Sequence, residues 1–309
     1  MAITAGMVKE LREISGAGMM DCKKALTATD GDMDKAVEFL RENGLAKAEK
    51  KAGRVAAEGM VATNISADGK TAAIVEVNSE TDFVAKNEKF QNYVAQVAAQ
   101  VATTTATDVD AFLEEAWIED ASKTVKENLA SMIAVIGENM TIRRFAKLQA
   151  EDGVIESYIH AGGKIGVLVQ AKTTENNDEV KACLKNVAMQ IAALNPKYTS
   201  RNEVDQDYIE HEKEILKAQA MKEKPDATEK IIDGMVMGRI NKELKEICLL
   251  DQVYVKAEDG KQSVGKYVES VAKATGTAFE ITGFVRYETG EGIEKVETDF
   301  AAEVAAQLQ

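Results

Sequence analysis

An internal repeat constrains the fold of this chain more than any other feature of its 309 residues. When Gly69-Lys70 is aligned with Gly163-Lys164, an offset of 94 residues, the stretch MVATNISADGKTAAIVEVN falls on VIESYIHAGGKIGVLVQAK. Both stretches read as strand, turn and strand, and an amphipathic helix follows each of them. The apolar helix positions also align, with Phe90, Val94 and Val97 on Leu184, Ala188 and Ile191. The repeat therefore predicts an α+β protein with two repeated hairpin-plus-helix α/β subdomains.

The first 54 residues predict a compact domain of three short helices. Apolar residues recur there at helical spacing, at Met19, Cys22 and Leu26 and then at Met33, Val37 and Leu40. Gly44 stands where a left-handed cap would end the third helix. Residues 46–59, AKAEKKAGRVAAEG, then read as a charged linker of small residues.

Two long charged helices are expected on either side of Lys224-Pro225-Asp226, within residues 197–250. Their apolar residues form a narrow seam, which is typical of an antiparallel coiled-coil hairpin that projects from the body. The seam residues are Tyr208, Ile215 and Leu216 on one arm and Ile232, Met235, Ile240, Leu244 and Ile247 on the other. Such a hairpin can form a homodimer or brace a partner, and the sequence leaves both roles open.

The remaining segments complete the domain assignment. Between the two copies we expect helices over 108–116 and 122–136, the second closed by Gly137. The tail is expected to contain, in order, a strand at 252–255, a helix capped by Ser263, a strand over 278–288 that completes the second sheet, and a terminal helix. The predicted domains are residues 1–54, 55–142, 143–196 with 251–288, 197–250, and a C-terminal helical module at 289–309.

The charge of the chain argues against nucleic acid as a direct partner. With 52 acidic and 38 basic side chains the formal net charge is −14, which repels a phosphate backbone. No stretch reaches 18 apolar residues, and the N-terminus carries charge where a signal peptide needs an apolar run. Cys22, Cys183 and Cys248 are odd in number and far apart, which fits a reducing compartment. We therefore expect a cytoplasmic protein that does not enter a membrane.

Candidate metal sites do not meet their physical requirements. Asp30, Asp32 and Asp34 resemble the start of a calcium loop, but the glycine and the glutamate that such a loop needs are replaced by Lys35 and Arg41. These aspartates are better explained as helix caps. With only two histidines in the chain, a Cys/His zinc site is also not expected.

Candidate catalytic motifs fail in the same way. Gly69-Lys70-Thr71 resembles the end of a phosphate-binding loop, but it lies between two strands rather than before a helix. We interpret it, and Gly162-Gly163-Lys164 in the second copy, as hairpin turns. No nucleophile motif of the G-x-S-x-G type is present either. We expect no cofactor and no enzymatic chemistry of the chain's own.

The tetrapeptide Glu-Thr-Asp-Phe occurs twice, at 80–83 and at 297–300. Thr81 and Thr298 are good helix N-caps, and an aspartate after each cap suits the positive end of a helix dipole. Capping does not explain Phe83, because the second copy has the polar stretch KTTENNDEV at this point and still forms the same unit. Phe83 is therefore a candidate anchor for a partner protein.

Three stretches of the sequence closely resemble signature stretches of the bacterial translation elongation factor Ts family. They are LREISGAGMMDCKKAL at 11–26, VEVNSETDFVAKN at 75–87 and TGFVRYETGEGIEKVETDFAAEVAAQ at 282–307. The resemblance covers essentially the whole chain in order. It implies a guanine nucleotide exchange factor that binds elongation factor Tu with GDP, dislodges Mg²⁺ and promotes GDP release so that GTP can bind.

The resemblance also implies which residues meet that partner. On the first unit, which is similar to a ubiquitin-associated (UBA-like) domain, the matching contact positions are Arg12, Met19, Met20 and Lys23. The positions that match the loop that intrudes into the GTPase and dislodges Mg²⁺ are Thr81, Asp82, Phe83 and Val84. The other matching positions are His160 of the second subdomain and, at the C-terminal helix, Thr298, Asp299 and Phe300.

Two other functions remain as alternatives. A ribosome- or RNA-associated binding protein could use the two subdomains as a platform, although the net charge and the lack of aromatics among basic residues argue against it. A holdase or assembly factor could grip its clients with the helical hairpin.

Overall fold

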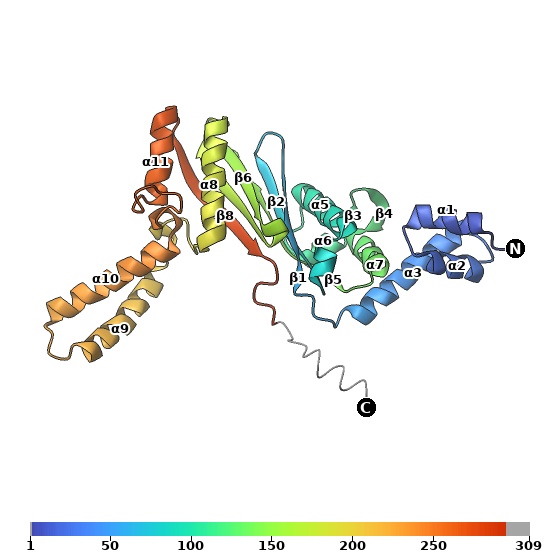
Figure 1. Cartoon of the computed structure of the whole chain (residues 1–309), viewed down its shortest axis with the longest axis horizontal. Coiled ribbons are helices and arrows are strands. Elements are labelled where there is room, and N and C mark those ends of the chain that lie inside the picture. Colours follow the sequence, from blue (N-terminus) through green and yellow to red (C-terminus); the bar gives the residue numbers. More distant parts are fainter. Residues whose placement is uncertain (1, 295–309) are drawn as a thin grey trace.

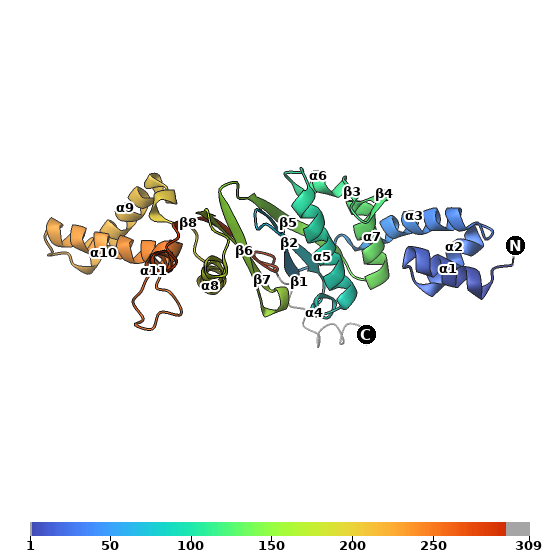
Figure 2. The same ribbon diagram turned by 90° about the horizontal axis from the view of Figure 1, so that it is seen from above.

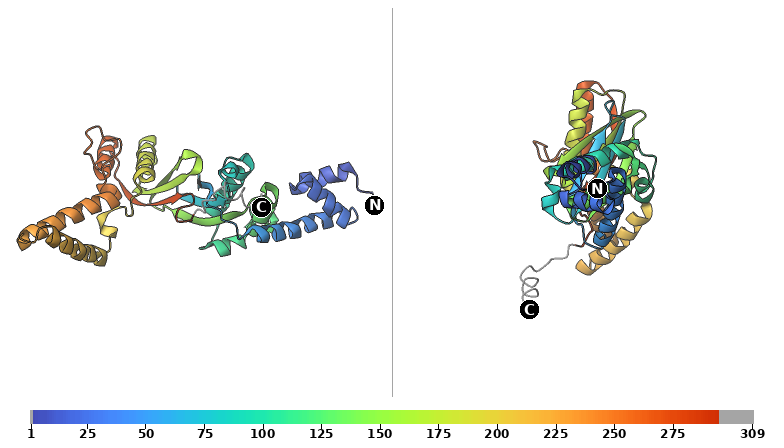
Figure 3. Two further views of the ribbon diagram at one scale, coloured as in Figure 1. Left: turned by 60° about the horizontal axis from the view of Figure 1, so that its bottom comes forward. Right: turned by 90° about the vertical axis from the view of Figure 1, so that its right-hand side faces the viewer.

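The computed structural model describes residues 2–294 of the chain. The molecule is elongated: the N-terminal helices form one end, a helical hairpin forms the other, and two sheets flanked by helices lie between them (Figure 1). The left view of Figure 3 shows the same extended outline, and its right view looks along the long axis from the N-terminal end. The predicted α+β class is confirmed, since the helices cover small antiparallel sheets. Within this described range, no helix is long and apolar enough to cross a membrane.

Residues 2–54 form the three predicted helices, α1 (Ala5–Ser15), α2 (Met19–Ala28) and α3 (Met33–Lys51). Thr4 caps α1 and Asp32 caps α3, because each side chain accepts a hydrogen bond from a backbone N–H of the first turn. The helices enclose a small core of their own, made of Val8, Leu11, Cys22, Ala25, Leu26 and Ala36.

The third helix is longer than predicted, so the expected cap at Gly44 is wrong. α3 continues past Gly44 to Lys51 and packs on α7 (Val125–Ile136) of the body. Gly44 is buried in this contact, where an added Cβ would lie 3.8 Å from the carbonyl oxygen of Ala130. Close packing of two helices offsets the roughly 1 kcal/mol that a glycine costs inside a helix. The first part of the predicted linker is therefore helical.

The first copy of the repeat forms an antiparallel sheet in the order β1-β2-β5. Its strands are β1 (Glu58–Ile65), β2 (Thr71–Ser79) and β5 (Met140–Gln149). The hairpin turn predicted at Gly69 is confirmed, and Gly69 has a φ of 71°, which suits glycine. The strand β5 was not predicted, and it runs through residue 142, where we had expected a domain boundary.

The second copy repeats this plan in the order β6-β7-β8. Its strands are β6 (Gly153–His160), β7 (Ile165–Thr173) and β8 (Phe279–Glu288), so the prediction that 278–288 completes this sheet is confirmed. The two sheets share a bulge, after Glu76 in β2 and after Gln170 in β7, positions related by the same offset of 94. The repeat is therefore present in backbone geometry as well as in sequence.

Helices cover the outer face of each sheet. α5 (Glu88–Thr103) and α7 lie on the first sheet, and α8 (Asp178–Leu194) and α11 (Val264–Thr275) lie on the second. Ser263 caps α11, as predicted. The six aligned helix positions are all completely buried: Phe90, Val94, Val97, Leu184, Ala188 and Ile191.

The inner faces of the two sheets pack against each other, so the body has four layers (Figure 2). Alternate residues of β2 serve two interfaces, since Ala73 and Val75 face the helices while Ala72 and Ile74 face the other sheet. The buried residues between the sheets are Val61, Ala72, Ile74, Ala150, Ile155 and Leu168. This arrangement fixes the position of one copy of the repeat relative to the other.

Residues 108–124 are only partly helical, so the two helices predicted there are correct in part. α6 (Val109–Leu113) is short, and a small hairpin of β3 (Ala116–Trp117) and β4 (Asp120–Thr124) follows it. α7 then begins with a capping box in which Thr124 and Glu127 each bond the other's backbone. Gly137 ends α7 in the left-handed conformation, as predicted.

Two buried glutamines explain why the segments at Ala116 and Val253 differ from the predicted helix and strand. Gln100 on α5 donates to the carbonyl of Ala116 (2.8 Å) and accepts from the N–H two residues later (2.7 Å). Gln190 on α8 donates to the carbonyl of Val253 (3.1 Å) and also accepts from the N–H two residues later (2.8 Å). The strand predicted around Val253 is therefore wrong, and only an isolated bridge to Ser263 is formed. Distant side chains satisfy these backbone groups instead of a helix or strand.

The predicted helical hairpin projects from the second subdomain (Figure 1). Its arms are α9 (Gln206–Glu223) and α10 (Glu229–Ile247). The buried residues of the seam on α10 are Ile232, Val236, Ile240 and Leu244. Ile215 was also placed in the seam, but it is 38% exposed and lies at its edge.

Glu76 is a fully buried carboxylate on the inner face of β2. It accepts hydrogen bonds from Arg143 (3.0 Å) and Arg144 (2.6 Å) on β5 and from the N–H of Gly290 (2.7 Å), which follows β8. Arg144 also lies over the ring of Tyr287 on β8, 4.3 Å from its centroid. One carboxylate thus joins the first sheet to the segment that ends the second.

The surroundings of Glu76 favour its ionised form. Burial alone raises the pKa of this carboxyl, but hydrogen bonds from Gly290, Asn78 and Arg144 outweigh burial and hold the pKa below its ordinary value of 4.5. Because the pKa of Glu76 is lower in the folded state than in the unfolded state, its ionised carboxylate stabilises the fold at pH values above the unfolded-state pKa. This stabilisation is lost as the pH falls through the folded-state pKa.

We predict that Glu76→Gln lowers the free energy of unfolding at pH 7 by about 2–4 kcal/mol, because it removes the buried counter-charge of two arginines. Urea unfolding measures this difference, which should shrink as the pH falls below the ordinary pKa of 4.5 and the wild-type carboxylate is itself protonated. Glu119→Gln, at an exposed site, is the control and should match the wild type. Equal stability of the Glu76→Gln and Glu119→Gln variants at pH 7 would show that the ion cluster does not hold the sheets together.

Candidate partner-binding site

The stretch from Thr81 to Val84 forms one helical turn directly after β2, labelled α4 (Asp82–Ala85). The hydroxyl oxygen of Thr81 accepts a hydrogen bond from the N–H of Val84 (3.5 Å), so Thr81 is an N-cap as predicted. Phe83 is 79% exposed, the largest exposed fraction among the large apolar side chains of residues 2–294. It makes almost no packing contribution to the chain that carries it.

Val84 does not belong to the exposed surface, although it was grouped with the three residues before it. It is 8% exposed and lies in the core with residues of α5 and the first sheet. Successive residues of this single turn point in different directions, because a helix places neighbours about 100° apart. Val84 therefore attaches the turn to the core, while Phe83 points to solvent.

Asp82 lies beside Phe83 and is already paired with a cation. Its carboxylate is 2.6 Å from the amino group of Lys86, one turn further along. The hydrogen bond from Lys86, with a smaller contribution from the charge of Lys164, holds the pKa of Asp82 below its ordinary value. Because both members of the pair are solvent-accessible, the pair is weak and a competing ligand can replace Lys86. Asp82 is an available carboxylate at neutral pH.

His160 is the last residue of β6 in the second copy, directly before the loop that leads to β7. The loop is the short 3₁₀ turn η1 (Ala161–Gly163) between β6 and β7, so the turn predicted here is confirmed. Gly163 has a φ of 99°, and an added Cβ would lie 2.8 Å from the Cβ of Met60, so this loop approaches β1 as closely as a glycine allows. His160 is exposed, and its Nδ1 is 2.9 Å from the hydroxyl of Tyr158.

α4 and the loop between β6 and β7 lie at the same end of the sheets, since both contact β1 (Figure 2). Lys164, which follows η1, pairs with Glu58 at the start of β1 (3.1 Å). The charge of Lys164 also contributes to the lowered pKa of Asp82. The structure thus brings Asp82, Phe83 and His160 to one edge of the molecule, from two copies of the repeat that are far apart in the sequence.

The remaining predicted contact residues lie elsewhere. Arg12, Met19, Met20 and Lys23 are exposed on α1 and α2 of the three-helix unit, away from α4 (Figure 2). Met19 and Met20 are 59% and 63% exposed, which is a high value for two adjacent apolar side chains. Thr298, Asp299 and Phe300 lie outside the described residues.

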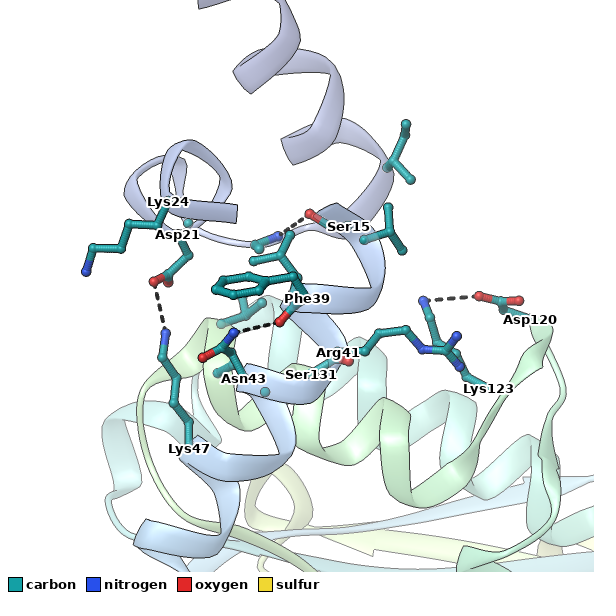
Figure 4. Close-up of a pocket in the computed structure, with 18 of the residues that line it drawn as sticks. Ser15, Asp21, Lys24, Phe39, Arg41, Asn43, Lys47, Asp120, Lys123 and Ser131 are labelled. Carbon is teal, nitrogen blue, oxygen red and sulfur yellow. Dashed lines mark hydrogen bonds and ion pairs between the residues drawn. The ribbon is translucent and has the colours of Figure 1, made fainter. Parts of the chain in front are cut away.

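A cleft of about 390 Å³, which was not predicted, separates the three-helix unit from the body (Figure 4). Its walls come from α1, α2 and α3 on one side and from α7 and the β3–β4 hairpin on the other. An ion pair between Asp21 and Lys47 (3.0 Å) crosses from α2 to α3, and Arg41 reaches the carbonyl of Ser122 (2.6 Å). The cleft therefore marks the boundary between two units that are joined mainly through α3.

Comparisons with known proteins agree with the resemblance of the three stretches. A family model described as "Elongation factor TS" matches residues 80–291. Proteins named "Elongation factor Ts" from Clostridium tetani and Clostridium botulinum (strain Eklund 17B / Type B) are 54% and 55% identical over 308 and 307 residues. These alignments cover 99% of this chain and 100% and 99% of the relatives. The chain belongs to the elongation factor Ts family.

Family membership determines which kind of activity the exposed residues serve. Members of the elongation factor Ts family are nucleotide exchange factors and carry out no chemistry of their own, so the prediction that this chain is not an enzyme is confirmed. Within residues 2–294, no group of three or more His, Cys, Asp and Glu is placed to hold a metal ion.

We predict that substitutions of two neighbours in α4 differ in their effect on stability. Val84→Ala should lower the free energy of unfolding by about 1–3 kcal/mol, because it removes buried methyl groups. Phe83→Ala should change it by less than about 0.5 kcal/mol, because that side chain is exposed. Chemical denaturation of both variants measures the difference. A loss of stability in Phe83→Ala as large as that in Val84→Ala would mean that Phe83 packs inside its own chain.

Proposed function

We propose that this chain is the guanine nucleotide exchange factor of elongation factor Tu and acts in the cytoplasm. It binds the GDP complex of that GTPase, displaces the Mg²⁺ that holds the nucleotide, and promotes GDP release so that GTP can bind. The observation that carries this proposal is the exposed Phe83 on a capped helical turn, with its neighbour Val84 anchored in the core. A rigid, solvent-exposed aromatic beside a carboxylate is suited to enter a pocket of another protein.

Exchange requires the chain to bind the nucleotide-free GTPase more tightly than the GDP complex. Accelerating release by about five orders of magnitude takes about 7 kcal/mol of differential stabilisation, at about 1.4 kcal/mol for each factor of ten. Burying one phenylalanine supplies only about 1.5–3 kcal/mol. Several contacts must therefore act on one partner, and an elongated molecule can provide them.

We assign those contacts to the matched residues in three groups. The exposed residues of the three-helix unit, residues 1–54, would dock on the GTPase domain; they are Arg12, Met19, Met20 and Lys23. His160 would contact a β-barrel domain of the partner from the neighbouring loop. In the C-terminal module the assigned residues are Thr298, Asp299 and Phe300. The helical hairpin, residues 197–250, would stay free to brace the partner or to form a homodimer.

Asp82 is the residue that we assign to the magnesium step. A carboxylate brought near a bound Mg²⁺ competes for the ligands and waters that keep the ion in place, and that ion bridges the phosphates of the nucleotide. The pair with Lys86 is accessible and replaceable, so Asp82 can change partner when the complex forms. Its target would be the metal, a metal-bound water or a backbone N–H of the GTPase.

We predict that Phe83→Ala slows GDP release by about 10- to 100-fold at saturating concentration, which corresponds to the burial of one phenylalanine. Stopped-flow release of a fluorescent GDP analogue from elongation factor Tu measures this rate. The control is Phe83→Leu, which keeps an apolar side chain and should retain part of the activity. Release that is not accelerated even by the wild-type chain would reject exchange activity, and steeply salt-dependent RNA binding would then favour an RNA-associated function.

We also predict that GDP weakens the complex, because the coupling between the two ligands is reciprocal. Calorimetric titration should give a lower Kd for nucleotide-free elongation factor Tu than for its GDP complex. Phe83→Ala should reduce the ratio of the two values, since it removes a contact that favours the nucleotide-free state. Equal Kd values for both forms of the GTPase would rule out a thermodynamic role in exchange.

A further inference from the structure

The helical turn that carries Phe83 is held from outside by Glu138. This glutamate lies just after α7, and its carboxylate accepts hydrogen bonds from both the hydroxyl (2.7 Å) and the backbone N–H (3.0 Å) of Thr81. Thr81 is the N-cap of α4, so Glu138 fixes the residue from which the turn starts. Hydrogen bonds to an ionised acceptor are stronger than those between neutral groups.

External support is needed because α4 cannot hold its own shape. A helix of four residues is far shorter than the length at which helices become stable in water. The cap bond from the N–H of Val84 to the hydroxyl of Thr81 is 3.5 Å long, which is weak. Three groups therefore restrain the direction of Phe83: Glu138, the buried side chain of Val84, and the buried hydroxyl of Ser79, which donates to the carbonyl of Thr81 (3.1 Å).

The segment that contains Glu138 also contacts the end of the three-helix unit. Lys51, the last residue of α3, donates to the carbonyl of Gly137. The buried side chain of Asn139 donates to the carbonyl of Arg54 (2.8 Å), and the N–H of Asn139 donates to Glu80. Residues 137–139 thus lie between the end of α3 and the residues that precede Phe83.

We propose that Glu138 is a positioning residue for nucleotide exchange: it holds Thr81 so that Phe83 is presented in its active direction before the partner binds. Hydrogen bonds of residues 137–139 connect the segment before Phe83 to the end of α3, and α3 connects it to the three-helix unit. The inference rests on the proposed function, because it assumes that Phe83 acts on the GTPase. If the turn with Phe83 is ordered before the partner arrives, binding does not lose the conformational entropy of ordering it.

The test is a double-mutant cycle on GDP release from elongation factor Tu, measured with a fluorescent analogue at saturating concentration of each full-length variant. Glu138→Ala should slow release by about 10-fold, since it removes two hydrogen bonds to a charged acceptor. Glu138→Gln should recover most of that loss, because its amide can accept from the N–H and donate to the hydroxyl oxygen of Thr81. In a chain that already carries Phe83→Ala, Glu138→Ala should cause no further loss.

Glu115→Ala is the matched control. Glu115 also accepts a hydrogen bond from a threonine hydroxyl in the same subdomain, that of Thr104 (2.6 Å), but it lies on the segment before β3 and not beside α4. This variant should release GDP as fast as the wild type at saturation. Thermal unfolding of each variant separates a loss of folding from a loss of positioning.

Hydrogen exchange of the free chain gives a readout that does not depend on the GTPase. The amides of Thr81 and Val84 should exchange at least about 10-fold faster in Glu138→Ala, and at the wild-type rate in Glu115→Ala. Unchanged protection of these amides would overturn the proposal.

The kinetic outcomes separate the two proposals. If Phe83→Ala slows release but Glu138→Ala does not, or if the two effects multiply in the double variant, Glu138 does not act through Phe83. If Phe83→Ala leaves release unchanged, the proposed role of Phe83 itself is wrong, and the positioning role of Glu138 is wrong with it.

Discussion

The buried carboxylate of Glu76 is the interaction on which the arrangement of this molecule depends. The chain contains two units that each have a sheet and a helical cover, and the apolar core that joins their inner faces is not directional by itself. Glu76 on β2 binds arginines of its own sheet and the backbone that follows β8 of the other. A buried charge tolerates few alternative arrangements, because it must keep its partners or pay a large desolvation cost. The buried charge therefore favours one packing arrangement of the two sheets.

The packing arrangement of the two sheets creates the candidate site. The turn with Phe83 follows the second strand of the first copy, whereas the loop with His160 joins the first two strands of the second copy. These segments become neighbours only because the sheets pack face to face in the observed direction. The close approach of Gly163 to Met60 is part of the same contact. The three-helix unit is added through the long α3, which gives the molecule a second exposed region far from the first.

Features with a local physical signal could be predicted from the sequence. The repeat, the buried helix faces, the coiled-coil seam and the caps at Thr81, Ser263 and Gly137 all depend on spacing or on one residue's conformational preference. Features that depend on distant partners could not. Gly44 ends no helix because α7 packs on it, and the segments at Ala116 and Val253 take their shape from Gln100 and Gln190 on other helices.

The same distinction applies to the candidate site. Phe83 could be identified because the second copy lacks an aromatic at this point, which made the side chain unnecessary for the fold. Val84 was grouped with the partner-contact positions although it is buried in this chain, since four consecutive residues of a motif do not show which of them turn inward. Glu138 had no signal at all, because it is 57 residues from Thr81 and an isolated glutamate in a loop resembles any solvated one.

The two ends of the packed sheets differ, although the repeat makes their backbones alike. Each end carries the hairpin turn of one copy and the loop after the second strand of the other, and at the far end Asn176 simply donates to the carbonyl of Asp68 (3.1 Å). The aromatic tip is present at one end and absent from its counterpart. The two ends of a scaffold that is nearly symmetric in its backbone are therefore unlike at the surface, because among residues 2–294 the exposed Phe83 lies at one end and the polar Asn176 at the other.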